Sequence, residues 1–344
     1  MPKMSRMPVL TSILACLSTV FPAQASAQST LNILVGYPPG AIYDAYARTV
    51  ARHFGKHLPG SPTLVPQNMA GAGSLRAANY LYNVAPKDGS TIGLFARGIP
   101  MQPLLDEQGI QFDARKFNWI GSPSSEVSIV FSWHSTPFKT MDDVRNREMV
   151  LAASGSGADS VIFPYILNGV LGTKFKVVTG YPGSAAMLLA VERGEVAGNA
   201  GTSWSSLLSF RPDWIRDGKI NVLLQVGGKK PPDLGQVPSA MDLAKNESDR
   251  KIMDLIFSRQ EMAFPFAAPP GVPAERLQAL RQAFEATMKD PDFLTDAKKQ
   301  HFEVDPVSGT DIEAIIRRVY ESPPDVIARA KAALEDGKKV TTQK

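Results

Sequence analysis

Apolar and polar positions alternate in a regular way at the start of the chain. Residues 31–35 form a short apolar run, which ends at a stretch rich in glycine and proline. Apolar side chains then recur every four residues from Ile42 to Leu58. Because this spacing is close to the roughly 3.6 residues of a helical turn, it places these side chains on one face of a helix. The pattern predicts a strand, a loop and a helix that packs on a core.

The same unit recurs along the chain, and a second series begins near 119–121 and 127–133. Further strands are predicted at 63–65, 91–95, 150–153, 174–178, 196–200 and 220–225, helices at 74–84, 159–171 and 184–193, and a loop at 201–204. Strands that alternate with helices predict an α/β fold, with mainly parallel sheets flanked by helices.

The last third of the chain has a different pattern. Residues 227–232 combine glycine, lysine and proline and predict a surface connection. One more strand is predicted at 262–267, followed by mostly helical segments from residue 273 onward. The final residues, 338–344, are expected to fray.

The N-terminal segment predicts export. Residues 1–27 contain no Asp or Glu, and the basic residues Lys3 and Arg6 precede an apolar run that closes on Ala25-Ser26-Ala27. These features are typical of a secretory signal peptide. The alternative is a short helix or membrane anchor, but the run is shorter than the roughly 20 residues that a membrane span needs. We therefore expect a periplasmic protein whose mature part has no membrane-spanning segment.

The cysteine count depends on that cleavage. Cys16 is the only cysteine in the sequence, so a mature chain cut after Ala27 would have none. Disulfides, thiolate catalysis and cysteine metal sites would then be excluded. The run Ile13-Leu14-Ala15-Cys16 loosely resembles a lipoprotein cleavage box, although Leu14 fits it poorly, and lipid anchoring at Cys16 stays an alternative.

Length and charge limit the classes of function. A chain of 344 residues is long enough for two lobes, each with its own core. The formal net charge of +4 falls to 4 − 2 = +2 once Lys3 and Arg6 are removed. Such a small charge does not predict nucleic-acid binding.

Loops rich in small residues follow several of the predicted strands. They are 37–41, 69–74, 154–158, 181–184 and 201–204. Small side chains let a ligand approach the backbone N–H groups at helix starts, where partial positive charge favours an anion. The alternative for any single loop is a tight turn without a ligand. No nucleotide-binding motif is present, because Arg76 occupies the third glycine position after Gly71 and Gly73.

A few side chains near these loops could serve a ligand. Arg97 follows the strand at 91–95 and could pair with a ligand carboxylate, or instead with Asp106 or Glu107 on the surface. Asp44 lies in the first turn of a helix, where it would complement the helix dipole. Tyr37, Tyr181 and Trp204 are candidate pocket walls or ordinary packing residues.

Catalytic and metal-binding patterns are scarce. His53 and His57 are four residues apart, but no glutamate follows His53 as a metalloprotease motif requires. No Gly-x-Ser-x-Gly elbow surrounds any serine. We therefore expect no enzyme activity, no metal and no cofactor.

Several of these segments together resemble a known family. Pro38-Pro39-Gly40-Ala41-Ile42-Tyr43-Asp44-Ala45-Tyr46-Ala47-Arg48 is similar to its Pro-Pro-Gly-Gly-x-x-Asp-x-x-Ala-Arg segment, 68–73 to its Asn-x-x-Gly-Ala-Gly loop and 86–91 to its Pro-x-Asp-Gly-x-Thr turn. The segments at 154–157 and 181–184 are similar to its Ser-Gly-x-Gly and Tyr-x-Gly-Ser loops. The chain thus resembles the periplasmic solute receptors of tripartite tricarboxylate transporters, or Bug family.

The resemblance implies a two-lobed periplasmic-binding-protein fold of type II-like architecture. Lobe 1 would comprise 28–122 and 227–344 and so contain both chain ends, and lobe 2 would be inserted at 123–226. A di-, tri- or aromatic carboxylate would be held in the cleft, with 37–44 and 70–74 holding the anion, and the receptor would be a monomer that serves inner-membrane transporter subunits. Including Arg97, the expected ligand-binding residues are Tyr37, Gly40, Ala41, Ile42, Tyr43, Asp44, Ala72, Gly73, Ser74, Arg97, Ser154, Ser156, Gly157, Ala158, Asp159, Tyr181, Ser184, Thr202 and Ser203.

Two positions depart from the family pattern. Ala41 replaces the second glycine of the first loop, which would narrow that loop. Gly201 stands where many members carry an aspartate, so an acidic contact to an amino group is missing. The second departure argues against an amino-acid ligand. An exported enzyme, or a receptor that docks on a membrane sensor, are the alternative functions on the same fold.

Overall fold

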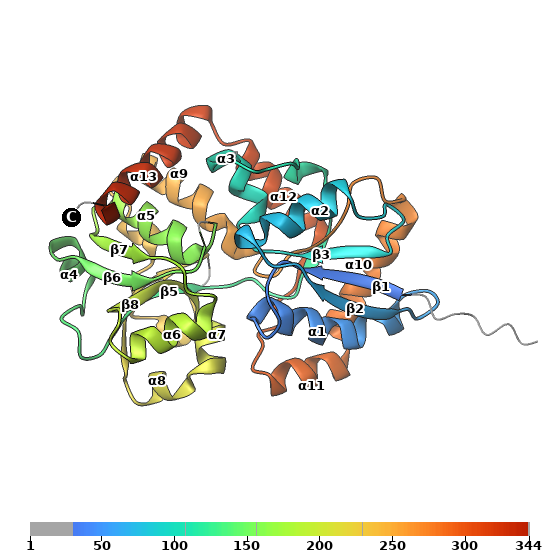
Figure 1. Ribbon diagram of the computed structural model, residues 1–344, viewed down its shortest axis with the longest axis horizontal. Helices are drawn as coiled ribbons and strands as arrows, with labels where there is room; N and C mark the ends of the chain where they lie inside the picture. Colours follow the sequence, from blue (N-terminus) through green and yellow to red (C-terminus); the bar gives the residue numbers. More distant parts are fainter. Residues whose placement is uncertain (1–29, 107, 156, 229, 343–344) are drawn as a thin grey trace, which may run out of the picture.

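The computed structural model describes residues 30–106, 108–155, 157–228 and 230–342, and it forms two lobes side by side (Figure 1). The signal peptide expected at 1–27 and Cys16 lie outside these residues. Each lobe is built on one sheet, which helices flank, so the two-lobed α/β fold predicted from the sequence is confirmed. We call the lobe with the first strand lobe 1 and the other lobe 2.

Lobe 1 contains a six-stranded sheet in the order β11-β4-β10-β3-β1-β2. Its strands are β1 (Thr30–Val35), β2 (Thr63–Asn68), β3 (Thr91–Leu94), β4 (Asn118–Ser122), β10 (Phe266–Ala268) and β11 (Val307–Ser308). The helices of this part are α1 (Ile42–Phe54), α2 (Leu75–Asn83), α3 (Gln102–Leu105), α10 (Ala274–Lys289), α11 (Pro291–Lys299) and α12 (Gly309–Tyr320). Tyr46, Val50 and Phe54 of α1 are buried, as their spacing predicts.

Lobe 2 contains a five-stranded sheet in the order β7-β6-β8-β5-β9. Its strands are β5 (Ser128–Trp133), β6 (Met149–Ala152), β7 (Phe175–Val178), β8 (Gly198–Ser203) and β9 (Ile220–Val226). The helices that follow or flank them are α4 (Met141–Asn146), α5 (Asp159–Leu171), α6 (Ser184–Glu192), α7 (Trp204–Phe210), α8 (Pro212–Arg216), α9 (Glu247–Phe257) and α13 (Pro324–Thr342).

The strand pairing is mixed rather than mainly parallel. β1 pairs in parallel with β2 and β3, and β6 with β7 and β8. The remaining ladders, which involve β10, β11, β5 and β9, are antiparallel. β5 in lobe 2 and β10 and β11 in lobe 1 thus run opposite to the strands of the βα units.

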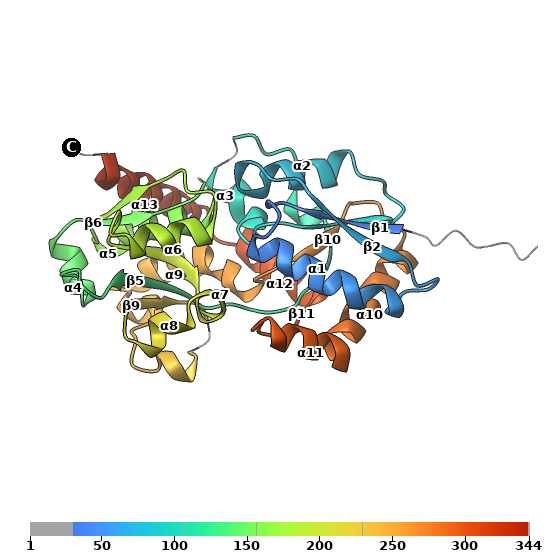
Figure 2. The same ribbon diagram turned by 60° about the horizontal axis from the view of Figure 1, so that its bottom comes forward.

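The C-terminal helix α13 lies against α5 of lobe 2, and α9 packs beside it (Figures 1 and 2). The C-terminal helix thus contacts lobe 2, and the assignment of both chain ends to lobe 1 stays a prediction. Glycines explain the close crossing of the two helices: a Cβ at Gly169 of α5 would lie 2.1 Å from the carbonyl oxygen of Ala333, and one at Gly337 of α13 would lie 1.9 Å from that of Tyr165. The exact boundaries 28–122, 123–226 and 227–344 stay a prediction.

Two further local expectations are wrong. Residues 338–342 continue helix α13 instead of fraying, because α5 supports that helix. The expected loop at 201–204 is the end of β8 and the start of α7. β8 can continue because Gly201, with a φ of +85°, is the extra residue of a bulge between the pairs Val130–Ala200 and Ile129–Thr202.

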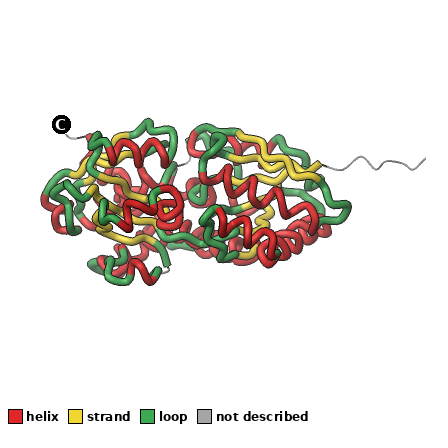
Figure 3. Tube along the Cα trace, turned by 90° about the horizontal axis from the view of Figure 1, so that it is seen from below, coloured by secondary structure: helices red, strands yellow, loops and turns green. Residues whose placement is uncertain are grey.

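The lobes are joined by extended crossings that pair with each other. Segment 123–127 links β4 to β5, and the chain returns to lobe 1 through 260–265 before β10. The amide of Glu126 donates to the carbonyl of Gln260 at 2.8 Å, and that of Ala263 to the carbonyl of Ser124 at 3.0 Å. Figure 3 shows two masses of helix and strand with such loop segments between them. Among the described residues, no helix has the length and apolar character that a membrane span requires.

Candidate functional site

A cavity of about 380 Å³ lies between the two lobes. Its lining comes from the segments that follow β1, β3, β6 and β7 and from the end of β8 with α7. The cavity therefore lies at the carboxyl ends of parallel strands, where α/β folds bind their ligands. Its volume is in the range of small-molecule sites.

The lobe 1 wall is aromatic and apolar. The rings of Tyr37 and Tyr43 are stacked with centroids 4.4 Å apart, and Phe264 meets Tyr43 edge to face at 5.0 Å. Tyr43 donates a hydrogen bond from its hydroxyl to the carbonyl of Ala263 at 3.1 Å. Burial raises the pKa of Tyr43, so this hydroxyl stays neutral. The described lobe 1 lining comprises Tyr37, Pro38, Pro39, Gly40, Ala41, Ile42, Tyr43, Ala96, Arg97, Gly98 and Phe264, without serine or threonine.

The lobe 2 wall carries the hydroxyl groups. Ser154, Ser160, Ser184, Thr202, Ser203 and Ser206 line it. Most of these hydroxyls are engaged within lobe 2; that of Thr202, for example, donates to the side-chain oxygen of Asn199 at 2.5 Å. The hydroxyls of Ser184 and Ser206 make no hydrogen bond to another residue in the described part of the chain. These two hydroxyls are therefore available to a ligand.

Three helices without a side-chain cap begin at the cavity. Ala41, Ala158 and Gly183 occupy the N-cap positions of α1, α5 and α6, and all three line the cavity. None of them provides a side-chain cap. The first N–H groups of a helix have no partner within the helix, and together they carry partial positive charge. The cavity can therefore attract an anion through main-chain groups.

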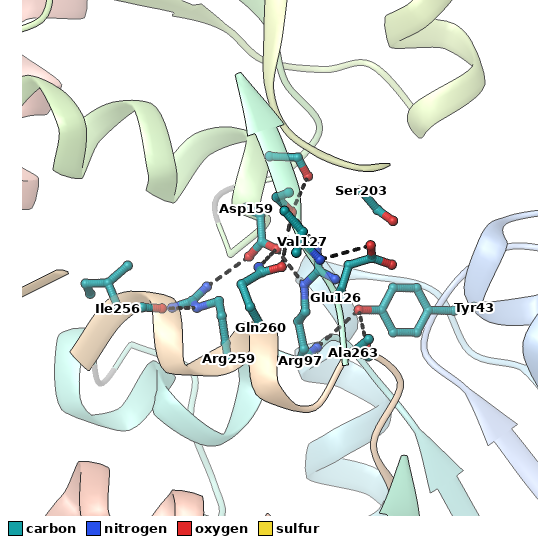
Figure 4. Close-up of polar contacts among 12 residues, drawn as sticks. Tyr43, Arg97, Glu126, Val127, Asp159, Ser203, Ile256, Arg259, Gln260 and Ala263 are labelled. Carbon is teal, nitrogen blue, oxygen red and sulfur yellow. Dashed lines mark hydrogen bonds and ion pairs between the residues drawn. The ribbon is translucent and has the colours of Figure 1, made fainter. Parts of the chain in front are cut away.

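The floor of the cavity contains a buried ion pair between the lobes (Figure 4). Arg97 follows β3 of lobe 1, and Asp159 is the first residue of α5 in lobe 2. The Arg97 Nε donates to Asp159 Oδ2 at 2.7 Å, and its Nη2 donates to Ser128 Oγ at 3.1 Å. Both side chains are about nine-tenths buried. Arg97 thus pairs with Asp159 and not with Asp106.

A second arginine and an amide complete the shell of Asp159 (Figure 4). Arg259 Nη1 donates to Asp159 Oδ1 at 3.3 Å, and Gln260 Nε2 donates to Asp159 Oδ2 at 3.1 Å. Both residues belong to the turn Ser258–Glu261, next to the return crossing. Glu126, in the other crossing, is buried and accepts a hydrogen bond from Ser205 Oγ at 2.8 Å. This cluster holds two arginines and two acidic residues, so its formal charges balance.

The shifts in pKa follow from this geometry. Burial alone would raise the pKa of the Asp159 carboxyl, but the guanidinium groups of Arg97 and Arg259 outweigh it and lower that pKa. Burial opposes the charged form of Arg97 as well, and the Asp159 carboxylate reverses the effect and raises the pKa of Arg97. Asp159 is therefore an ionised carboxylate at neutral pH.

The lobes also touch on the far side of α7. Ser209 Oγ donates to the carbonyl of His301 in lobe 1 at 2.9 Å. Together with the Arg97–Asp159 pair, this contact holds the lobes together at two places around the cavity. The two contacts thus connect the lobes on different sides of the cavity.

The structure brings most of the expected ligand-binding residues together. Those that line the cavity are Tyr37, Gly40, Ala41, Ile42, Tyr43, Arg97, Ser154, Gly157, Ala158, Asp159, Ser184, Thr202 and Ser203. Ser156 lies outside the described residues. Asp44, Ala72, Gly73, Ser74 and Tyr181 do not line the cavity, and neither does the candidate wall residue Trp204.

The residues away from the cavity have structural contacts. Asp44 is buried and accepts hydrogen bonds from the Gly40 amide at 2.9 Å and from Asn68 Nδ2 at 2.8 Å. Ser74 Oγ donates to the carbonyl of Gly36 at 3.1 Å. The loop at 70–74 follows the edge strand β2 and approaches lobe 2, where a Cβ at Gly73 would lie 3.6 Å from the Cα of Gly157. These contacts fix the loops that the ligand would meet.

Sequence reasoning missed several lining residues. Ala96, Gly98, Ser160, Ala185, Ala186, Met187, Ser206, Phe210 and Phe264 line the cavity as well. Ser160 and Ala185 to Met187 lie just beyond loops that were identified, so extending those loops by one helical turn would have found them. Phe264 comes from the return crossing, and no local pattern marks it.

The two departures from the family pattern have different structural settings. Ala41 lies in extended backbone at the N-cap of α1, where a side chain is tolerated. At Gly201 a Cβ would lie 2.7 Å from the carbonyl carbon of Asp159, in addition to the positive φ. An aspartate at position 201 would therefore collide with the start of α5.

The two histidines considered for metal binding are engaged elsewhere. His53 Nε2 lies 3.0 Å from Asp296 Oδ2, and His57 Nε2 lies 2.8 Å from Asp290 Oδ2. Both contacts join α1 and the turn after it to the region of α11. The described residues contain no group of three or more metal-ligating side chains.

Two sheets on either side of a cavity lined by helix N-termini define a two-lobed solute-binding protein. Residues 46–329 match the model of the tripartite tricarboxylate transporter family receptor, and the chain belongs to that family. A search of curated proteins found no match.

Solved structures show the same fold. The periplasmic binding protein BugD is 20% identical, with a TM-score of 0.68 over 88% of this chain and 97% of that one. MatC from Rhodopseudomonas palustris, with bound malate, is 18% identical with a TM-score of 0.66 over 89% and 98%. Rpa4515 from the same organism, with adipate, is 19% identical with a TM-score of 0.66 over 90% and 97%.

Proposed function

We propose that this protein is a periplasmic receptor that captures a small organic carboxylate in its interlobe cavity and delivers it to the membrane subunits of a tripartite tricarboxylate transporter. The observation that carries the proposal is the convergence of three N-termini without side-chain caps, those of α1, α5 and α6, on one cavity. Membership of the receptor family supports it. Malate and adipate in the structures of MatC and Rpa4515 are carboxylates of the kind proposed.

We infer that the ligand is released chemically unchanged. The two ionised side chains of the described lining, Arg97 and Asp159, are bonded to each other. The same lining contains no histidine or cysteine that could act as base or nucleophile. The ligand would favour the closed state of the receptor by its contacts to both lobes. The membrane subunits of the transporter would then recognise this closed state.

Export rests on residues 1–27 and on the family. We expect cleavage after Ala27, and the mass and N-terminal sequence of the protein recovered from a periplasmic fraction would test it. Retention of Cys16 with an attached lipid would contradict that cleavage site. The monomeric state stays a prediction, which light scattering with and without ligand would test.

Thermal unfolding with a panel of carboxylates tests the binding function. A ligand that binds only the folded state at 100 times its Kd stabilises that state by about 2.7 kcal/mol, so the melting temperature should rise by several degrees. Matched alcohols and amides without the carboxylate serve as controls and should leave the melting temperature unchanged. If no mono-, di-, tri- or aromatic carboxylate raises it and calorimetry detects no heat, the proposed function is wrong.

A further inference from the structure

Four buried polar side chains form a closed ring of hydrogen bonds at the floor of the cavity. Arg97 Nε and Gln260 Nε2 both donate to Asp159 Oδ2, at 2.7 and 3.1 Å. Arg97 Nη2 donates to Ser128 Oγ at 3.1 Å, and that hydroxyl donates to Gln260 Oε1 at 3.2 Å. Figure 4 shows Arg97, Asp159 and Gln260 turned toward one another. Each member of the ring therefore bonds to two others.

The direction of each bond in the ring follows from the donors and acceptors present. An ionised carboxylate only accepts hydrogen bonds, so the Gln260 amide turns its Nε2 toward Asp159 and its Oε1 toward Ser128. The Ser128 hydroxyl donates its proton to that oxygen and accepts from Arg97 with a lone pair. Arg97, Ser128 and Gln260 are less than a tenth exposed, and the Asp159 side chain is 10% exposed. Loss of any one member therefore leaves buried partners unsatisfied.

The four members come from four separate segments, and only one of these segments belongs to lobe 1. Arg97 follows β3 of lobe 1. Asp159 begins α5, and Ser128 begins β5 at the end of the crossing from lobe 1. Gln260 starts the return crossing, and its carbonyl accepts the amide of Glu126, which ties the two crossings together. Lobe 1 therefore enters the ring through one side chain, whose two acceptors belong to lobe 2.

Gln260 is bonded to both acceptors that Arg97 uses. One end of its amide holds Asp159 Oδ2, and the other end holds Ser128 Oγ. The backbone next to Arg97 also lies close to this turn, because a Cβ at Gly98 would be 2.5 Å from Arg259 Nη1. A rotation of lobe 1 about the crossings would therefore break the bonds from Arg97 or displace Gln260. The position of lobe 1 against lobe 2 thus depends on a glutamine that is not among the described residues of the cavity lining.

We infer that Gln260 is a positioning residue, which sets the relative orientation of the two lobes by holding Asp159 and Ser128 in place for Arg97. Arg97 and Asp159 line the cavity from opposite lobes, so this orientation also sets the separation of the aromatic wall from the hydroxyl-bearing wall. Such positioning requires no particular solute and so goes beyond the proposed function. The receptor without ligand is enough to test it, and a negative result would leave the carboxylate-binding function intact.

The distance between two spin labels, one on each lobe, measures the relative orientation of the lobes. Cys16 is the only cysteine of the sequence, so the mature receptor expected from residue 28 onward carries labels only at introduced cysteines. Val84→Cys after α2 and Leu189→Cys on α6 replace apolar side chains that are 63% and 41% exposed. Pulsed electron paramagnetic resonance on the ligand-free receptor then gives the distribution of distances between the two labels.

Gln260→Met keeps the length of the side chain and removes both of its bonds in the ring. The mean label distance should change by more than about 2 Å, which is the scale of a domain rearrangement. Gln225→Met is the matched control, because Gln225 is as buried as Gln260 and its Nε2 donates to two carbonyls within lobe 2, those of Leu234 and Val237. This control should lower the melting temperature and leave the label distance unchanged.

Two results would overturn the inference. An unchanged label distance in Gln260→Met, together with a lower melting temperature, would give Gln260 a purely structural role. An equal change of label distance in Gln260→Met and Gln225→Met would show that the orientation of the lobes follows the general loss of stability and not the ring.

A smaller change covers the case in which Gln260→Met does not fold. Ser128→Ala breaks the ring at one of the two acceptors of Arg97 and should also change the label distance. Ser132→Ala is its matched control, because it removes another buried hydroxyl of β5, one that donates to the carbonyl of Phe138. Equal label distances in Ser128→Ala and Ser132→Ala would contradict the role of the ring.

Discussion

The two walls of the cavity offer a ligand different kinds of contact. Among the described residues, the lobe 1 wall is a set of aromatic rings whose polar side chains are the two tyrosines and Arg97; Tyr43 and Arg97 are buried and Tyr37 is partly buried. The lobe 2 wall carries the hydroxyls and two of the three uncapped helix N-termini. The comparison teaches that an anion site can be built almost without free cations, because main-chain groups supply the positive end and aromatic rings supply the contact area.

The Arg97–Asp159 ion pair connects the two walls, and its loss should have the largest effect on the unfolding free energy. Asp159→Ala would leave the buried guanidinium groups of Arg97 and Arg259 without their carboxylate. Breaking a buried ion pair from one side costs about 3–5 kcal/mol, and urea unfolding should show a loss of that size. Asp217→Ala, an exposed aspartate paired with Arg216 in the same lobe, is the control and should change stability by less than about 0.5 kcal/mol. Similar losses of unfolding free energy for Asp159→Ala and Asp217→Ala would show that the buried ion cluster does not stabilise the protein.

A side chain at Gly201 should disturb the lobe 2 wall. Gly201→Ala combines a φ of +85° with a Cβ only 2.7 Å from the backbone of Asp159. Left-handed backbone at a residue other than glycine costs about 1–3 kcal/mol, so unfolding should become easier by about 2 kcal/mol. Gly180→Ala, also at positive φ but with no atom within 4 Å of its Cβ, separates the backbone cost from the collision. Equal losses of unfolding free energy for Gly201→Ala and Gly180→Ala would show that the start of α5 moves aside, so that the collision adds no cost.

Acid should reversibly weaken the Arg97–Asp159 ion pair. The folded-state pKa of Asp159 is lowered, so the unfolded chain binds more protons than the folded protein as the pH falls below the usual aspartate range of about 4. This contribution to stability is present above that range and is lost as the pH falls through the folded-state pKa. The unfolding free energy of the wild type should therefore decline more steeply below about pH 4 than that of Asp159→Asn. Parallel curves would mean that Asp159 does not carry the acid sensitivity.

The lobe 1 wall should respond more weakly to the loss of one hydroxyl. Tyr43→Phe keeps the ring stack but removes the bond to the carbonyl of Ala263 and the acceptor for the amide of Arg97. A net loss of about 1 kcal/mol in unfolding free energy is expected, because each hydrogen bond contributes about 0.5–1.5 kcal/mol. Binding of a carboxylate should change little, since this hydroxyl bonds to protein groups. A loss of binding without a loss of stability would place the hydroxyl on the ligand instead.

The smallest effect is expected at the mouth of the cavity. Phe210 ends α7, is 46% exposed and lines the cavity from lobe 2. Phe210→Ala should change the unfolding free energy by less than about 0.5 kcal/mol, as exposed substitutions do. It should weaken binding of ligands with a long apolar body by a few-fold and leave acetate unaffected, which calorimetry can compare. A large loss for acetate would show that the polar wall depends on this ring.

The sequence pattern predicted those helices and strands well whose bounds are set by residues within the same segment. The helix at 159–171 agrees with α5 in both bounds, because its apolar positions and flanking glycines are visible in sequence. The strand expected at 262–267 is Phe266–Ala268, since residues 262–265 belong to the return crossing, where the amide of Ala263 donates to the carbonyl of Ser124. α7 and α9 were not predicted: α7 begins at Trp204, the last residue of the expected loop, and α9 lies between the surface connection expected at 227–232 and the strand expected at 262–267.

The sequence by itself determined the two-lobed α/β fold and the loops that surround the cavity, because strand, loop and helix signals depend on neighbours a few residues apart. Only the tertiary structure decided that Arg97 meets Asp159, which is 62 residues away, and that α13 crosses to α5 at Gly169 and Gly337. Such pairings join distant parts of the chain, and the periodicity of any one segment carries no information about its partner.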